Sequence, residues 1–181
     1  MDGGDVRMPA RDLGAVFDEH LRDEFELHDA VATMETMSAE PHLYHAPTMI
    51  GGNGKEEIFR FYRDHFVTTW PRDTSTTRIS RTIGEDQVVD ELVMTFTHDT
   101  VIDALLPGVT PTGRRVSLPV VVVVKFHEGK IVHEHIYWDQ ACLLVQVGLL
   151  DPAGLPVTGA AQAQSLLDRS YATNALLASK P

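Results

Sequence analysis

The octapeptide HEHIYWDQ (residues 133–140) carries a proton-exchanging side chain at every second position. Successive side chains of an extended strand point to opposite faces, so His133, His135, Tyr137 and Asp139 are predicted to share one face. Imidazole, phenol and carboxylate groups accept, donate and hold protons. The row therefore indicates either the wall of a pocket in which a proton moves or a wetted surface of a sheet.

A second histidine falls on an apolar face. In ELVMTFTHDT (residues 91–100), the large apolar residues Leu92, Met94 and Phe96 alternate with polar ones, and His98 continues their row. We expect His98 to point into the space between a sheet and its covering helices.

Composition and charge favour a small ligand. The chain has 181 residues, which is the usual size of one domain, and its 43% hydrophobic content is that of a globular protein. A net charge of −11 disfavours a nucleic acid or an anionic membrane as partner. Apolar runs are too short to cross a bilayer, and residues 1–12 lack the apolar core of a secretory signal. The single cysteine, Cys142, fits a reducing compartment, so we expect a cytoplasmic protein.

Hydrophobic periodicity predicts an α+β chain. Residues 1–10 read as a tail, and helical spacing covers residues 11–37 and 55–69 on either side of a turn-rich segment. The period then changes to that of strands over residues 75–83, 87–100, 115–127 and 130–140. The short turns GED and HEGK predict antiparallel hairpins. Residues 141–150 continue the sheet or form a short helix, and residues 159–179 read as a terminal helix.

The valine-rich strand predicts a second covering layer. Val120, Val122 and Val124 form one apolar face, yet Val121 and Val123 make the opposite face apolar as well. A strand that is apolar on both sides needs cover on both sides. We expect a second copy of the chain to supply it, giving a homodimer through the sheet.

Three segments carry a family resemblance. PTGRRV, the stretch KFHEGKIVHEHIYWDQACLLVQVGLL and the upstream YHAPTMIGGNGKEEIFRFYRDHF resemble SnoaL-like polyketide cyclases of the nuclear transport factor 2-like superfamily. The resemblance implies a cone-shaped, curved antiparallel sheet wrapped around N-terminal helices, as in cystatin-like folds, with a deep apolar cavity. It implies a domain over residues 11–150. Residues 151–181, which go beyond the family pattern, are expected to add a helical extension to the same domain. This sequence departs from the family pattern in having His98-Asp99-Thr100 and a longer VIDALLPGVT segment.

The resemblance also implies chemistry without a cofactor or a metal. Its catalytic histidine and aspartate match His98 and Asp139. A carboxylate base and a histidine acid suit removal of a proton beside a carbonyl, the step shared by cyclases, isomerases and dehydratases. The expected substrate is a small hydrophobic carbonyl compound. The residues expected to contact it are Tyr137, His135, Tyr44, Trp70 and Phe96.

Three alternatives stay open. Asp139 can instead cap the following segment while His98 is a core histidine, which leaves a small-molecule-binding dimer without catalysis. An epoxide hydrolase of the same fold is the other enzymatic reading. His42 and His45 with His133 and His135 could be drawn as a metal site, but no motif supports one. The remaining histidines, His20 among them, are assigned to packing, helix surface or turns.

Overall fold

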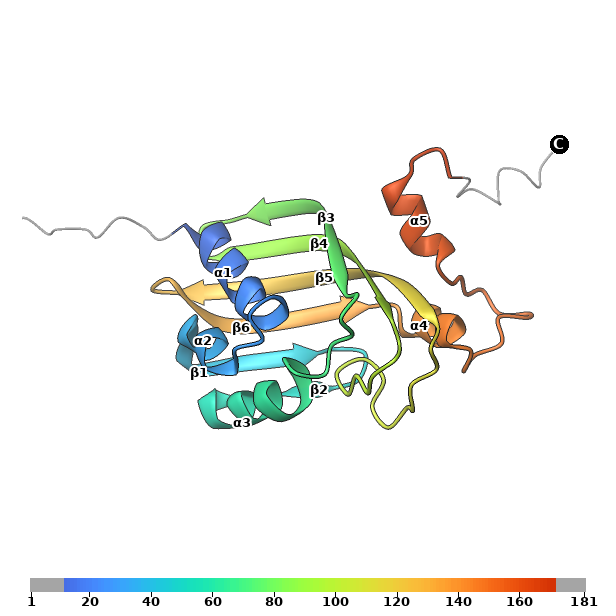
Figure 1. Ribbon diagram of the computed structural model, residues 1–181. Coiled ribbons are helices and arrows are strands. Elements are labelled where there is room, and N and C mark those ends of the chain that lie inside the picture. The colour runs from blue at the N-terminus through green and yellow to red at the C-terminus, as the bar shows by residue number, and fades with distance from the viewer. Residues whose placement is uncertain (1–11, 172–181) are drawn as a thin grey trace, which may run out of the picture.

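A six-stranded sheet with helices across one face forms the centre of the computed structural model, which describes residues 12–171 (Figure 1). The predicted tail over residues 1–10 lies outside the described residues. The elements in chain order are α1 (Leu13–Phe25), α2 (Ala30–Glu35), β1 (Met37–His45), β2 (Ile50–Asn53), α3 (Gly54–Phe61), a π-helix η1 (Tyr62–Phe66), β3 (Ser75–Ile83), β4 (Gln87–Thr97), β5 (Arg115–His127), β6 (Lys130–Trp138), α4 (Gln140–Val147) and α5 (Ala161–Leu167).

The strand order is β2-β1-β6-β5-β4-β3. The predicted α+β class and curved sheet are confirmed, but the sheet is not wholly antiparallel, because β1 runs parallel to β6. No local pattern indicated this pairing, because it joins residues far apart in the sequence, such as Met37 with Ile131 and His45 with Ile136. It has the effect of bringing β1 beside the HEHIYWDQ strand.

Both predicted hairpins are present. β3 and β4 pair from Ile83 and Val88 outward, across the GED turn. In the β5–β6 hairpin His127 pairs with Lys130, and the two residues between them, Glu128 and Gly129, both have positive φ. That is the geometry of the tight turns that match the right-handed twist of strands.

The N-terminal helical segment is two helices rather than one. Asp12 caps α1 by accepting hydrogen bonds from the backbone of residues 14 and 15, and Asp29 caps α2 in the same way. Between them His28 adopts a left-handed φ of 52°, which breaks the helix. A second aspartate cap inside a helical pattern was therefore the signal for the break.

The segment read as turn-rich contains two strands that sequence reasoning missed. Pro41, in the segment between the two predicted helical regions, lies within β1 where the register with β6 shifts between Met37 and His42, a position that tolerates proline. Gly51 of β2 has a φ of +157°, and a Cβ there would lie 1.9 Å from the Leu43 carbonyl oxygen. Glycines in this segment thus allow close strand pairing as well as turns.

The C-terminal part leaves the sheet. Residues 140–147 form α4, so the helical alternative for residues 141–150 is correct. The predicted helix over residues 159–179 is a short one, α5, within the described residues, and residues 172–179 lie outside them. Over residues 12–171, no helix has both the length and the apolar character that a bilayer crossing requires.

The two faces of β5 differ in burial, although both are apolar. Val120, Val122 and Val124 are buried in the core, whereas Val121 is exposed and Val123 half-buried on the convex face. α5 lies against part of this convex face beside Val121. A homodimer through the remainder of the face stays a prediction.

One buried ion pair ties α1 to the sheet. Arg81 of β3 donates two hydrogen bonds to the fully buried Asp90 of β4, at 2.6 and 2.7 Å. The same guanidinium donates to the Gly14 carbonyl, contacts Asp18 at 2.8 Å and lies over the Phe17 ring. α1 is thereby anchored across the sheet edge at three points.

Removing Asp90 should destabilise the fold strongly. We expect Asp90→Ala to lower the free energy of unfolding by about 3 kcal/mol, because it leaves the largely buried Arg81 charge without its main partner. The surface pair of Lys125 and Asp86 provides the control, and Asp86→Ala should cost about 0.5 kcal/mol or less. Urea unfolding followed by circular dichroism measures both, and equal losses would contradict the role given to Arg81 and Asp90.

Candidate functional site

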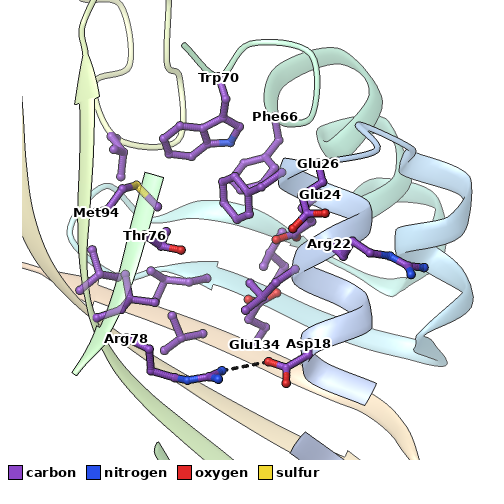
Figure 2. Close-up of a pocket in the computed structure, with 18 of the residues that line it drawn as sticks. Asp18, Arg22, Glu24, Glu26, Phe66, Trp70, Thr76, Arg78, Met94 and Glu134 are labelled. Carbon is purple, nitrogen blue, oxygen red and sulfur yellow. Dashed lines mark hydrogen bonds and ion pairs between the residues drawn. The ribbon is translucent and has the colours of Figure 1, made fainter. Parts of the chain in front are cut away.

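A cavity of about 430 Å³ lies between α1 and the concave face of the sheet. Its walls are mainly apolar and aromatic, with contributions from α1, β1, β4, β5, β6 and residues 62–70. Figure 2 shows Phe66, Trp70 and Met94 together at one end of it. Mostly apolar cavities of this size with a few convergent polar groups are the usual form of small-molecule sites.

The cavity opens between α1 and β3. Asp18, Arg22 and Glu26 are one turn apart along α1 and exposed, and Thr76 and Arg78 face them from β3. Arg78 Nη1 donates to Asp18 Oδ1 at 2.9 Å across the opening (Figure 2). The polar rim is therefore distinct from the apolar interior.

Four buried polar side chains meet at the cavity wall. We call His20, Glu24, Tyr62 and Glu134 the carboxyl–histidine cluster. His20 Nε2 lies 3.1 Å from both Glu24 Oε1 and Glu134 Oε2, and the Tyr62 hydroxyl lies 3.3 Å from Glu134 Oε2. Glu24, Tyr62 and Glu134 line the cavity, whereas His20 lies behind them. Groups from two helices and a central strand thus converge on one point.

The hydrogen bonds define the protonation of His20. Thr36 Oγ1 donates its only proton to the Thr33 carbonyl at 2.7 Å, so it can only accept from His20 Nδ1, 2.6 Å away. Nδ1 therefore carries a proton. Nε2 faces two carboxyl oxygens, so a second proton there makes an imidazolium that both carboxyl groups share.

The surroundings of Glu24 and Glu134 shift the pKa values of the two carboxyl groups in opposite directions. Burial alone disfavours a charged His20, but the adjacent Glu24 and Glu134 outweigh it and raise the His20 pKa to about 10. Burial likewise opposes ionisation of Glu134, yet the His20 cation holds the Glu134 pKa below its usual range. Burial, together with the Glu134 charge, raises the Glu24 pKa. Burial and the same two carboxyl groups raise the Tyr62 pKa well above its ordinary value, so the phenol keeps its proton.

The same atoms could hold a metal ion. Ligand atoms of His20, Glu24 and Glu134 all lie within 4.8 Å of one another. With Nδ1 bonded to Thr36, a neutral His20 would offer Nε2 to a divalent metal, as second-shell partners commonly arrange. One imidazole and two carboxylates are an acceptable donor set for zinc, manganese or iron. Protons and a metal are therefore alternative occupants of this cluster.

Comparison with known proteins identifies the family. The sequence profile described as the SnoaL-like domain matches residues 10–134, more than two thirds of the chain. The chain belongs to the SnoaL-like family. The resemblance seen in the sequence is thereby confirmed.

Solved structures agree on the fold. A candidate SnoaL-like polyketide cyclase from Jannaschia sp. CCS1 is 19% identical, with a TM-score of 0.61 over 82% of this chain and all of that one. AclR from Streptomyces galilaeus, a candidate hydroxylase, is 20% identical, with a TM-score of 0.57 over 78% and 88% of the two chains. SalBIII, an epoxide hydrolase/cyclase-like enzyme with a role in pyran ring formation in salinomycin, is 17% identical, with a TM-score of 0.52 over 70% and 90%. No curated protein matches the sequence significantly.

Asp139, predicted as catalytic base, does not line the cavity of this SnoaL-like chain. It follows Trp138, the last inward residue of β6, and its carboxylate is turned to the C-terminal helices. Oδ1 accepts from the Cys142 backbone as the cap of α4, and Oδ2 accepts from Gln162 of α5 at 3.0 Å. The capping alternative for Asp139 is therefore observed.

His98, the predicted acid, is buried but also lies outside the cavity lining. Its Nδ1 is 3.1 Å from Thr112 Oγ1 of the PTGR turn, and its Nε2 has no partner among the described residues. Burial lowers the His98 pKa. A catalytic pair of His98 and Asp139 stays a prediction that this geometry does not favour.

The polar row of β6 lies on the convex face of the sheet. His135 Nε2 is 2.9 Å from His42 Nδ1, the His135 ring stacks on His133, and it contacts the Tyr44 ring edge-on. Tyr137 is 44% exposed on the same face. Burial, with the neighbouring imidazoles, lowers the pKa of His133 and of His135. His133, His135 and Tyr137 share one face as predicted, but it is the face opposite the cavity, and Asp139 lies beyond the end of β6.

Sequence reasoning missed the polar side chains of the cluster on the inward face of β6 and on α1. Glu134 of β6 points into the cavity with Ile136 and Trp138, because side chains alternate along a strand. His20 was assigned to packing, helix surface or turns, and Glu24 was not singled out, although a titratable pair four residues apart on the apolar side of α1 was the available signal. Of the predicted substrate contacts, Trp70 lines the cavity, and the Phe96 ring packs edge-on against the Trp70 ring.

The charged His20 should make the free energy of unfolding decrease as the solution becomes alkaline. Its pKa is about 6.5 when unfolded and about 10 when folded, so its contribution is complete below pH 6.5 and is lost as pH rises toward 10. We expect the free energy of unfolding to fall between pH 6.5 and 9.5, and His20→Gln to flatten that fall. Urea titrations at several pH values measure it. His65→Gln, an exposed histidine, should keep the wild-type slope; an unchanged slope in His20→Gln would refute the assignment.

Proposed function

We propose that this SnoaL-like protein is a cofactor-independent acid/base enzyme of the cyclase, isomerase or dehydratase type. Its substrate is a small hydrophobic carbonyl compound held in the cavity between α1 and the sheet. The observation that carries the proposal is the carboxyl–histidine cluster, in which two buried carboxyl groups with oppositely shifted pKa values line an apolar cavity. Environments that separate two such pKa values define acid/base pairs in enzymes.

Glu24 is the proton carrier in this proposal. Its raised pKa makes its carboxylate a stronger base than an ordinary glutamate and lets its acid form persist closer to neutral pH. Glu134 stays ionised beside His20, and its charge helps keep the Glu24 pKa raised. The two carboxyl groups thus divide the work of moving a proton and of balancing charge.

His20 and Tyr62 position the carboxyl groups. His20 does not reach the cavity, so it acts through Glu24 and Glu134, which its Nε2 holds at equal distances. Tyr62 lines the cavity with a protonated hydroxyl that donates to Glu134.

The proposed step is proton transfer beside a carbonyl. The Glu24 carboxylate takes a proton from the carbon next to the carbonyl, and the electron pair of that C–H bond moves to the carbonyl oxygen as an enolate. Protonated Glu24 then returns the proton to the same or another carbon, which restores the base. Apolar walls exclude water and so leave the Glu24 carboxylate poorly solvated, which strengthens it as a base.

Two other functions remain as proposals with less support. Catalysis by Asp139 and His98 requires them to reach a substrate, and neither lines the cavity. In epoxide opening, Glu24 would be the acid and Glu134 its ionised carboxylate partner. SalBIII, which has the same fold, is described as epoxide hydrolase/cyclase-like. Styrene oxide hydrolysis tests the latter directly.

The proposed base should be essential for proton abstraction. We expect the protein to accelerate deuterium uptake beside the carbonyl of 2-tetralone in D₂O, followed by proton NMR, and Glu24→Gln to slow the catalysed exchange by about 10²–10⁴-fold. Asp139→Asn is the matched control, because it removes a carboxylate that caps α4, and should retain exchange. Loss of exchange in Asp139→Asn with activity intact in Glu24→Gln would transfer the role to Asp139.

Chelation should leave this activity intact. If protons occupy the carboxyl–histidine cluster, dialysis against EDTA leaves the exchange rate unchanged, and added zinc slows exchange by displacing the His20 Nε2 proton. Exchange rates before and after dialysis, with metal content by mass spectrometry, measure this. Activity that disappears with EDTA and returns with zinc or manganese would replace the proposed mechanism with a metal-dependent one.

A further inference from the structure

An indole donor without a protein acceptor lies in the cavity wall. Trp70 is only 7% exposed and lines the cavity. Among residues 12–171 its Nε1–H finds no hydrogen-bond acceptor. A buried donor left unpaired costs free energy, so each such group in a native structure calls for a missing partner.

The Trp70 ring is held in place by its neighbours. Its centroid lies 5.3 Å from that of Phe25, 5.4 Å from that of Phe66 and 6.0 Å from that of Phe96. Packing on these sides prevents the indole from turning its nitrogen to solvent. In Figure 2 the nitrogen is on the part of the ring nearer α1, and Glu24 and Glu134 lie between Trp70 and the rim pair of Asp18 and Arg78.

The second tryptophan of the chain gives an internal comparison. Trp138 lines the same cavity and is 9% exposed, but its Nε1–H donates to Gln140 Oε1 at 2.6 Å. Gln140 in turn donates to the Leu105 carbonyl at 3.1 Å. Of these two similarly buried indoles, Trp70 alone has an N–H that finds no acceptor within the described part of the chain, residues 12–171.

We infer that the Trp70 Nε1–H binds a neutral oxygen acceptor, a carbonyl oxygen in the simplest case, on a compact apolar ligand. This rests on the proposed function in taking the cavity as the substrate site. A neutral acceptor is favoured because two carboxyl groups lie in the same lining and disfavour a nearby anion, and because Tyr62 already donates its hydroxyl proton to Glu134. The apolar walls accept a fused-ring or similar hydrocarbon skeleton. Trp70 is accordingly a specificity residue that selects oxygenated over hydrocarbon ligands.

Indole NMR signals test the inference directly. The chain has two tryptophans, so a ¹⁵N-labelled protein gives two indole N–H signals, which Trp138→Phe assigns. Titration with 2-tetralone should move the Trp70 signal downfield as the hydrogen bond forms and affect Trp138 less. Tetralin, which has the same skeleton without the carbonyl, should not produce that downfield shift. A Trp70 signal that responds equally to both compounds, or binding of neither, overturns the inference.

Affinities of matched variants provide the second measurement. A site built around a hydrogen-bond donor rejects an analogue without the acceptor, so wild type should bind 2-tetralone about tenfold more tightly than tetralin by calorimetry. Trp70→Phe should lose that preference, and Tyr137→Phe, on the face of the sheet opposite the cavity, should keep it. Preference retained in Trp70→Phe overturns the inference, and if that variant does not fold, the wild-type NMR titration decides.

The readouts separate this inference from the proposed function. Both measurements follow equilibrium binding, which does not need turnover. A Trp70 shift with 2-tetralone but no catalysed deuterium exchange would overturn the proposed function and leave the acceptor site standing. Catalysed exchange without any preference for the ketone would overturn the inference about Trp70 and leave the proposed function standing.

Discussion

The site depends on one constraint, which is that two carboxyl groups in an apolar interior need a cation. His20 supplies it, and Thr36 fixes the ring so that Nε2 faces Glu24 and Glu134 equally. Replacing the cation by a neutral group leaves two negative charges competing for one proton in a medium that solvates neither. The unequal proton affinities of Glu24 and Glu134 follow from this sharing, and so does any acid/base chemistry in the cavity.

The sequence predicted the fold better than the site, for a reason that lies in the period of a strand. HEHIYWDQ was recognised as a strand that carries chemistry, and His133, His135 and Tyr137 do share a face, whereas Asp139 follows the strand and caps α4. Which face meets the cavity depends on the sheet's curvature and on α1, neither of which is written in the strand itself. Glu134 lies on the other face of the strand. Its neighbours there, Ile136 and Trp138, are apolar, so that face was interpreted only as part of the hydrophobic core.

The missed strands have a similar cause. β1 contains Pro41, and β2 contains two glycines, so local propensity argued against both. Their pairing is a long-range property: β1 is stabilised by a parallel neighbour from the far end of the domain. By contrast, the two hairpins were predictable, because the GED and HEGK turns are local signals that join strands of matching pattern.

α1 links the stability of the fold to the geometry of the site. One side of this helix carries His20 and Glu24, and its exposed stripe forms the rim of the cavity. No disulfide can hold the helix to the sheet, because the chain has a single cysteine. The position of the helix therefore depends on packing and on the anchoring of its first turns by Arg81 and Asp90. A shift of α1 by one ångström would unbalance the two 3.1 Å contacts of His20. Residues near β3 and β4 can therefore influence proton affinities in the carboxyl–histidine cluster without touching it, because they determine where its cation lies.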